Sequence, residues 1–392
     1  MSVDRDYFCA RKFSEITVNI GQQTIGTCCA ETPSKINFNE LQQKNMFNLS
    51  HMIHEREMML DNQRVVSCDG CWQPEDQGLP SLRLAQKHNK KIPQSPTVQQ
   101  VKSFNLTLGT KCGMTCSYCT QNASSSWFKD LQHNGPYELI DQVDLYSIGN
   151  KNLVIKKINA TFAGSEKNEQ ILFEQICNAA TSVDTWYVTG GETLLHIKLL
   201  LKLLNIIPST AQVVIMTGLG IKEKQFTKFL NILKAYPNIT LGISAENIHE
   251  LYEFNRYGNT YKNFLTCLTA IKNSGIDYQF FSTLSNLTVF GYVDFVQWAD
   301  KKIEAQPIIT PSFMQIQNLD PASKKFLIEK MQTNYYSEFD WLIETLQGDH
   351  ETSLKDKKNL KVFLQEFSGR RKLNLNIFPK TFLEWLDIHV VQ

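Results

Sequence analysis

Three cysteines lie close together in the stretch KCGMTCSYC, at Cys112, Cys116 and Cys119. Thiolates are the ligands of iron–sulfur clusters, and this spacing lets one short loop hold three irons of a cubane cluster. The fourth iron would stay open for chemistry. For the three cysteines alone, a structural zinc ion with one further ligand from elsewhere in the chain is the alternative.

A second motif favours the cluster over zinc. The apolar run 186–188 leads through Thr189 into Gly190, Gly191 and Glu192. The two glycines let the backbone approach a ligand closely, and the glutamate offers a carboxylate to a bound ammonium group.

The elements that position these motifs follow a repeated pattern. From residue 102 onward, short strand-like runs alternate with amphipathic helical runs, which predicts an α/β fold with a parallel sheet wrapped in helices. Six strands predict a partial (β/α)6 TIM-like barrel, in which catalytic groups lie on loops at the carboxyl ends of the strands. Both motifs are therefore expected on one rim. The predicted strands span 104–108, 185–189, 212–217, 239–244, 278–284 and 308–315, and the predicted helices span 166–180, 194–206, 222–235, 261–272 and 288–305.

The pattern CxxxCxxC with Tyr118 before its last cysteine, followed by a strand ending in Gly-Gly-Glu, resembles the radical S-adenosylmethionine superfamily. The resemblance covers residues 102–320. It implies that Cys112, Cys116 and Cys119 hold a [4Fe-4S] cluster whose open iron is chelated by S-adenosylmethionine. Tyr118 would lie near the adenine, and Glu192 would contact the methionine ammonium.

The resemblance also implies a reaction. One electron from the reduced cluster would cleave the sulfonium, and the resulting 5′-deoxyadenosyl radical would abstract hydrogen from a substrate, while the protein orients and shields it. A peptide or protein is the favoured substrate, and a small molecule such as a nucleoside or sugar is the alternative. A non-catalytic iron–sulfur scaffold or electron carrier is a third hypothesis. A flavodoxin or ferredoxin would serve as electron donor.

Further polar residues follow the later predicted strands. Ser244 and Glu246 resemble the superfamily's contacts to ribose and methionine, and Arg256 stands where a carboxylate-binding arginine is often found. Ser282 and Asn286, around the fifth predicted strand, are comparable candidates. A surface or indirect role is the alternative for each of them.

Five more cysteines precede this region, one more than a four-ligand site requires: Cys9, Cys28, Cys29, Cys68 and Cys71. Neighbours on an extended strand point to opposite faces, so one of the adjacent pair is expected to be a ligand, and Cys28 is favoured. Four thiolates fit either a tetrahedral zinc ion or a fully ligated cluster.

A closer resemblance bears on this choice. An early cysteine, a glycine-containing hairpin ending in a cysteine, and then CxxCWxxExxGxxSxR look like twitch-domain radical S-adenosylmethionine proteins, which are related to the SPASM-domain enzymes. The resemblance implies an auxiliary [4Fe-4S] cluster. Here the module precedes the barrel instead of following it. The last pattern consists of Cys68, Cys71, Trp72, Glu75, Gly78, Ser81 and Arg83.

The predicted organisation has three parts. Residues 1–95 form a twitch-like auxiliary-cluster module, residues 96–325 the barrel, and residues 326–392 a helical extension that packs on the barrel. The segment 128–167 is expected to be an inserted lid over the barrel mouth. The basic cluster at residues 370–372 is expected to be a solvated helix end. Cys177 and Cys267 are expected to be small buried hydrophobic residues.

Composition excludes other classes. The formal net charge is +1 and charged residues make up 20%, so nothing indicates a nucleic-acid partner or a membrane surface. The N-terminus carries charges where a signal peptide needs an apolar core, and no apolar run approaches the length of a membrane span. A cytoplasmic protein is expected, and in a reducing compartment clustered cysteines favour metal ligation over disulfides.

Overall fold

The computed structural model describes residues 7–76, 78, 81–84, 92–140, 146 and 166–389. The chain divides into two compact units, which are described one at a time. The first consists of Met1–Gly109, Ile155–Met216 and Leu233–Thr240, and the second of Thr110–Val154, Thr217–Ile232 and Leu241–Gln392.

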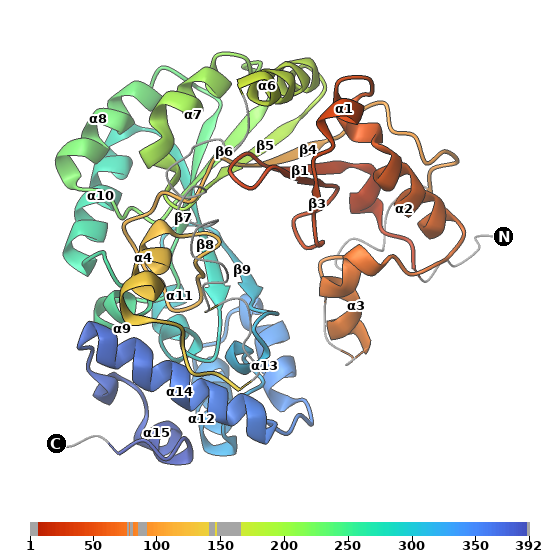
Figure 1. Ribbon diagram of the computed structural model, residues 1–392. Helices are drawn as coiled ribbons and strands as arrows, with labels where there is room; N and C mark the ends of the chain where they lie inside the picture. Colours follow the sequence, from red (N-terminus) through yellow and green to blue (C-terminus); the bar gives the residue numbers. More distant parts are fainter. Residues whose placement is uncertain are drawn as a thin grey trace. The chain divides into compact units, whose positions relative to one another are not determined.

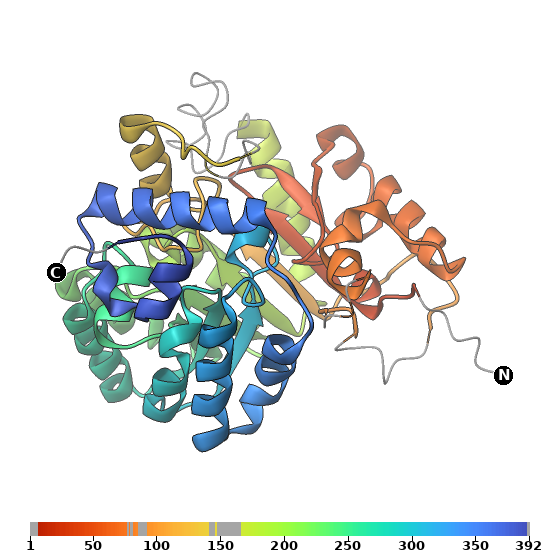
Figure 2. The same ribbon diagram turned by 90° about the horizontal axis from the view of Figure 1, so that it is seen from below.

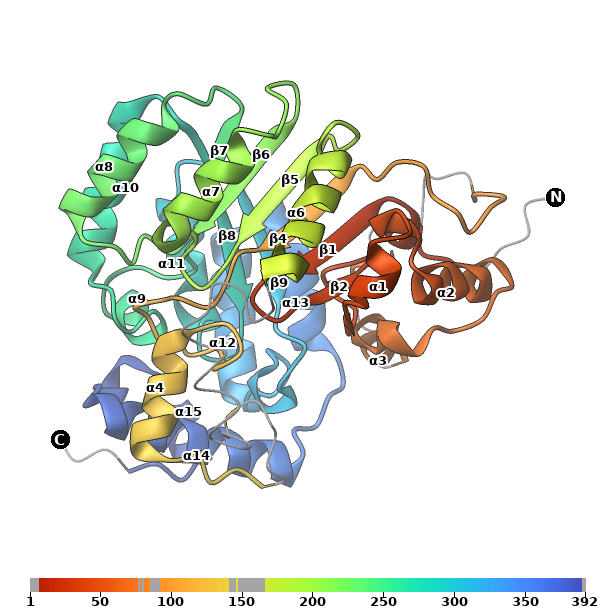
Figure 3. The same ribbon diagram turned by 45° about the horizontal axis from the view of Figure 1, so that its top comes forward.

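The first unit is built on a sheet with the strand order β3-β2-β1-β4-β5-β6. Parallel pairing joins β1, β4, β5 and β6, whereas β2 pairs antiparallel with both β1 and β3. Figure 3 shows β4, β5 and β6 side by side. The bounds are β1 Glu15–Asn19, β2 Thr24–Gly26, β3 Ser34–Lys35, β4 Ser103–Thr107, β5 Thr185–Thr189 and β6 Gln212–Thr217.

The register makes β4 and β5 end level with each other, because Ser103 pairs with Thr185 and Thr107 with Thr189. Side chains alternate between buried and half-buried along both strands. The rings of Phe104 and Trp186 stack with their centroids 4.4 Å apart. Apolar packing between the two strands therefore fixes where the following loops begin.

The N-terminal part of this unit is not separated from the sheet. The predicted hairpin is present as β1 and β2, and β1 extends the parallel sheet by pairing with β4, so the sheet crosses the proposed boundary at residue 95. The helices of this part lie together (Figure 1). They are α1 Phe38–Leu41, α2 Ser50–Leu60 and α3 Asp69–Asp76, and the unit also contains α6 Glu166–Ala180 and α7 Ile197–Leu204.

The second unit contains the strand order β7-β8-β9. Its strands are β7 Ile239–Ser244, β8 Asp277–Leu284 and β9 Ile303–Pro307, with β8 and β9 parallel. The mixed α/β architecture with a parallel sheet is as predicted, and the barrel stays an expectation. Its helices are α4 Ser125–Asn134, α8 Glu223–Leu233, α9 His249–Asn255, α10 Tyr261–Ser274 and α11 Tyr292–Trp298.

The C-terminal part of this unit is helical, as predicted, and begins at Pro321. Ser353 caps the long helix by accepting a hydrogen bond from the Asp356 amide, and Lys372 ends it in the left-handed conformation. Figure 2 shows this helix beside α4. The helices are α12 Pro321–Thr333, α13 Asp340–Gln347, α14 Leu354–Arg371 and α15 Lys380–Trp385.

Three expectations were wrong. The last strand is Ile303–Pro307, and the segment predicted as that strand instead contains a 3-10 turn at Ser312–Met314. Cys177 is exposed, because it lies on the outer side of α6, whereas Cys267 is buried as expected. The basic cluster is not a solvated helix end, because Arg371 is buried.

Most of the predicted lid, residues 141–145 and 147–165, lies outside the described residues. In the described part of the chain, no helix has both the length and the apolar character that crossing a membrane requires.

Candidate functional site

The loop that carries Cys112, Cys116 and Cys119 follows β4 directly and opens the second unit. Cys112 and Cys116 are buried and pack with Met114, and Cys119 and Tyr118 lie half-buried against them. The structure thus brings the three predicted thiols together in one cluster.

Helix α4 holds the backbone of this loop. The Ser125 hydroxyl accepts a hydrogen bond from the Cys112 amide at 3.1 Å and donates one to the Cys112 carbonyl at 3.2 Å. The Trp127 indole N–H donates to the Cys116 carbonyl at 2.9 Å. Buried backbone groups need such partners, so the start of α4 fixes the positions of two of the three thiols.

The thiols sit in a low-dielectric environment. Burial raises the pKa of Cys116 well above its usual value, opposed by the Arg256 guanidinium and reinforced by the other two thiols. Burial and the neighbouring Cys112 raise the pKa of Cys119 to about 12. Burial thus favours the protonated form of Cys116 and Cys119, and a metal core that binds them would have to deprotonate both thiols.

A second segment, directly after α9, pairs with the cysteine loop. The Thr115 amide donates to the Tyr257 carbonyl at 2.8 Å, and the Ser117 amide donates to the Asn255 carbonyl at 2.9 Å. Gly258 has φ +105, and a Cβ there would lie 2.6 Å from a backbone oxygen of the cysteine loop. The close approach therefore requires glycine at this position.

Glu246 and Arg256 form a buried ion pair near the thiols. The Arg256 Nη2 lies 2.6 Å from the Glu246 Oε2, and the guanidinium carbon lies 5.5 Å from the centre of the Tyr118 ring. Burial raises the pKa of the Glu246 carboxyl, and Arg256 and the nearby Tyr118 hydroxyl oppose that rise. Among the described residues, neither the Glu246 Oε1 nor the Tyr118 hydroxyl has a hydrogen-bond partner of good geometry. Such groups are suited to a polar ligand.

The two predicted serines differ in their surroundings. Ser244 is the half-buried last residue of β7. Ser282 is buried, and its hydroxyl donates to the Ala245 carbonyl at 2.6 Å. The Asn286 side-chain amide donates to the Phe313 carbonyl at 2.8 Å. Both Ser282 and Asn286 thus stabilise the protein's own backbone.

The Gly-Gly-Glu motif follows β5 in the first unit. The Gly191 amide donates to the Gly109 carbonyl at 2.8 Å, and a Cβ on Gly190 would lie 3.2 Å from the same oxygen. Glu192 is fully buried and caps the 3-10 turn Thr193–His196 by accepting from the Leu194 amide. The motif therefore connects the ends of β4 and β5.

Four N-terminal cysteines line one small cavity in the first unit, and they are the four predicted as ligands. Cys28 faces this cavity, whereas Cys29 is exposed and accepts a 3.5 Å contact from Arg11. The cavity is lined by Cys9, Cys28, Cys68 and Cys71, together with Arg11, Lys12, Ala30, Glu31 and Arg83.

Trp72, Glu75, Ser81 and Arg83 of the CxxCWxxExxGxxSxR pattern form a connected group beside these cysteines, whereas Gly78 is exposed. The Arg83 guanidinium pairs with the Glu75 carboxylate and lies 4.5 Å from the centre of the Trp72 ring. The Ser81 hydroxyl donates to the same carboxylate, and the Trp72 indole N–H donates to a backbone carbonyl at 2.8 Å. Gly78 has φ +72, which glycine adopts without strain.

The sequence analysis missed Lys12, which is fully buried beside this cavity. Its ammonium pairs with Glu31 and Glu55 and donates to the Ser67 hydroxyl at 3.2 Å. Burial by itself would lower the pKa of Lys12. Glu31, Cys68 and Glu55 raise it by more, so the net pKa lies above its usual value and the ammonium stays charged. A lone lysine in a short N-terminal segment carries no pattern that would predict this.

The donor atoms fit an iron–sulfur cluster in both places, because thiolates are its ligands and each iron takes its own sulfur. Among the residues that the structure describes, no three His, Cys, Asp or Glu side chains already surround a single point as a metal ion would require.

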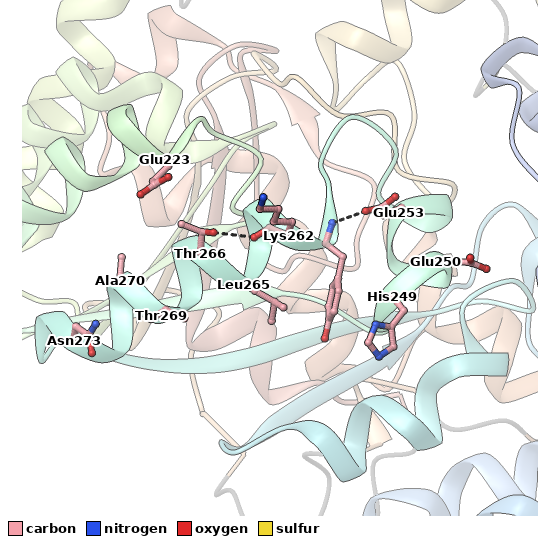
Figure 4. A pocket seen from close by; sticks show the side chains of 11 residues that line it. Glu223, His249, Glu250, Glu253, Lys262, Leu265, Thr266, Thr269, Ala270 and Asn273 are labelled. Atoms are coloured by element: carbon pink, nitrogen blue, oxygen red, sulfur yellow. Dashed lines mark hydrogen bonds between the residues drawn. The ribbon is translucent and has the colours of Figure 1, made fainter.

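A broad groove along α9 and α10 lies on the outside of the second unit and contains none of the predicted site residues (Figure 4). Tyr261 donates from its amide to Glu253 at 2.9 Å and packs on His249, with ring centroids 4.9 Å apart. The groove is open and lacks buried polar groups. It is not the candidate site.

A scan against protein-family models and a search of the curated proteins find no match. Among solved structures, the chain is similar to polyhistidine-tagged anSMEcpe with bound AdoMet, at 15% identity and a TM-score of 0.40, over 60% of this chain and 58% of that one. It is also similar to Streptococcus suis SuiB, at 12% identity and a TM-score of 0.39, over 79% and 71% of the two chains. A third is the radical S-adenosylmethionine methyltransferase TsrM from Kitasatospora setae, at 12% identity and a TM-score of 0.32, over 60% and 43%. The matched region of anSMEcpe is thus less than two thirds of that protein, and all three likenesses are distant.

Proposed function

We propose that this chain is a radical S-adenosylmethionine enzyme that acts on a peptide or protein. One observation carries the proposal: the three thiols of CxxxCxxC are gathered in a buried cluster beside the Glu246–Arg256 pair. A cluster bound by Cys112, Cys116 and Cys119 would supply the electron that cleaves S-adenosylmethionine to methionine and a 5′-deoxyadenosyl radical.

The chain's own residues would bind and orient the cofactor. The Arg256 guanidinium is suited to the methionine carboxylate, and the free oxygen of Glu246 to a hydroxyl or ammonium donor. Tyr118 offers an aromatic face. For Gly190, Gly191 and Glu192 a cofactor role rests on the resemblance alone. Ser244, the half-buried last residue of β7, is a further candidate contact.

The N-terminal cysteines extend the proposal to an auxiliary [4Fe-4S] cluster. Cys9, Cys28, Cys68 and Cys71 line one cavity, with three cations and one carboxylate among the other lining residues. Each of these cations already pairs with a carboxylate, so the four thiols themselves are what supports this cluster. With four protein ligands it would serve electron transfer or structure, and this module is what favours a peptide or protein substrate over a small molecule.

The test is anaerobic. The purified chain is reconstituted with iron and sulfide, reduced with dithionite and given S-adenosylmethionine, and 5′-deoxyadenosine is measured, with Cys112→Ala as the control. Product from the wild type and none from the variant supports the proposal. A wild-type chain with its full iron complement that yields no product, with or without candidate peptides, favours the scaffold hypothesis.

A further inference from the structure

Arg371, the last residue of α14, reaches the cysteine loop from the far end of the sequence. Its side chain is only 3% exposed. The Nε donates to the Thr115 Oγ1 at 3.0 Å, and the Nη1 donates to the Tyr137 hydroxyl at 3.1 Å. Thr115 lies between Cys112 and Cys116, so the contact falls inside the loop itself.

Aromatic rings hold the guanidinium in place. Its central carbon lies 4.1 Å from the centre of the Phe367 ring, 4.8 Å from that of Trp127 and 5.6 Å from that of Tyr257. A planar guanidinium can stack on such rings while it donates from its edge, which a lysine ammonium cannot do. The site is therefore built for arginine.

Two of these rings belong to the residues that support the loop. Trp127 donates to the Cys116 carbonyl at 2.9 Å. The Tyr257 carbonyl accepts from the Thr115 amide at 2.8 Å. Arg371 thus contacts the loop directly and also contacts Trp127 and Tyr257, two residues outside the loop that hydrogen-bond to it.

We propose that Arg371 is a positioning residue for the iron-binding loop, and that α14 is in this way part of the catalytic unit. The inference rests on the proposed function. Groups that orient metal ligands influence how firmly the metal is held, and a nearby charge influences the potential of a cluster. Arg371 would slow the loss of iron from the cluster, and its positive charge would raise the cluster's reduction potential.

The adjacent Arg370 provides a matched control. It pairs with Glu366, donates to the Gly135 carbonyl at 2.9 Å and lies 3.4 Å from Asp130. In the part of the chain that the structure describes, its hydrogen bonds and ion pairs lie outside the cysteine loop. Asp130 also lies 3.4 Å from Arg371, so either substitution leaves this carboxylate with one cationic partner.

The experiment uses the full chain with Cys68→Ala, which removes the proposed auxiliary cluster. After reconstitution, iron loss to a chelator is followed by absorbance, and the reduction potential is measured by electron paramagnetic resonance. Arg371→Gln is expected to lose iron about tenfold faster than Arg370→Gln and to have a lower potential. Arg371→Lys keeps the charge but not the stacking, so it should lose iron quickly while its potential stays near that of the parent.

The outcomes separate this inference from the proposed function. A parent chain that binds no iron at Cys112, Cys116 and Cys119 overturns the proposed function and the inference with it. If Arg371→Gln and Arg370→Gln hold iron equally well and their clusters have the same reduction potential, the inference is overturned and the proposed function is not. If Arg371→Gln does not fold, Thr115→Val removes the loop's side of the contact, and iron retention equal to that of the parent then overturns the inference.

Discussion

At the residue scale, the Glu246–Arg256 pair of the candidate site carries a large desolvation cost. Both side chains are at most 4% exposed, so two charges have been removed from water. Desolvation of such a pair can exceed the Coulombic gain, so the pair contributes little to stability by itself. Under the proposed function, the pair would instead serve to bind the cofactor.

We predict that Glu246→Gln lowers the free energy of unfolding of the cluster-free protein by about 3 kcal/mol, because it leaves the Arg256 charge buried without its partner. Urea unfolding measures this. The double variant Glu246→Leu/Arg256→Met should lose less than the single variant, since it buries no charge. A double variant whose free energy of unfolding falls more than that of the single variant would contradict the view that the pair serves binding and not stability.

At the element scale, the contact between the cysteine loop and the segment after α9 depends on Gly258. Gly258→Ala introduces a Cβ 2.6 Å from a loop oxygen in addition to an unfavourable φ. We expect Gly258→Ala to lower the thermal stability and to reduce iron bound at Cys112, Cys116 and Cys119.

Gly275 is the matched control for this prediction. It has φ +79, and a Cβ added there would meet no neighbouring heavy atom within 4 Å. Gly275→Ala should cost only the strain of its backbone conformation, about 1 kcal/mol, and leave iron binding unchanged. Equal effects of the two substitutions on bound iron would contradict a role for the close approach.

The start of α2 predicts a pH dependence. Hydrogen bonds from Ser50, together with Lys44, lower the pKa of Glu40 to about 2, against its usual 4.5. A lowered carboxyl pKa stabilises the folded state above the unfolded pKa, and this contribution is lost as the pH falls from about 4.5 toward 2. Glu40→Gln should therefore cost about 1 kcal/mol near neutral pH and almost nothing near pH 2.

Denaturant unfolding at several pH values measures this difference. Glu57→Gln on α2 is the control, because the Glu57 side chain is 53% exposed and its carboxylate lies 3.9 Å from the His54 ring. A cost for Glu40→Gln that does not change with pH would refute the assignment.

The sequence predicted elements where apolar runs are bounded by turn residues. β5, β6 and β7 begin and end at the predicted residues. β9 was missed because it lies at the edge of the sheet and its side chains are half-buried or exposed, so no apolar run reveals it. The segment 308–315 was mistaken for a strand because it is largely apolar, but it contains the 3-10 turn Ser312–Met314 instead.

For the site, residue type and spacing in the sequence indicate which residues could be ligands. They do not indicate which residues support those ligands. The grouping of the three loop cysteines and of the four N-terminal cysteines could be predicted from residue type and spacing, and their role as metal ligands stays a prediction. Thr115 and Arg371 are 256 residues apart, and a single hydrogen bond between them leaves no periodic signal. Lys12 was not predicted for the same reason.

At the scale of the whole molecule, each compact unit contains its own group of cysteines. Cys9, Cys28, Cys68 and Cys71 belong to the first unit, and the Cys112–Cys119 loop belongs to the second. Each group has its own supporting residues. The two proposed clusters should therefore bind and lose iron independently.

We predict that Cys68→Ala removes about half of the iron bound after anaerobic reconstitution, whereas Cys29→Ala leaves it unchanged. Cys68 lines the shared cavity, and Cys29 is exposed outside it. Colorimetric iron and sulfide assays give the count, and the visible spectrum distinguishes iron–sulfur from zinc. Equal iron in Cys68→Ala and the wild type would rule out the second cluster, and a loss in Cys29→Ala would exchange the roles of the adjacent pair.

The placement of two indoles gives the chain its own optical probes. Trp127 donates a hydrogen bond to the Cys116 carbonyl, and Trp72 packs against Cys9 and Cys68. An iron–sulfur group bound at either place would absorb the emission of its neighbouring tryptophan. Trp72→Phe and Trp127→Phe would each remove one of these fluorophores. Comparing their fluorescence with that of the wild type during reconstitution would then show when each group of cysteines binds its cluster, without any added label.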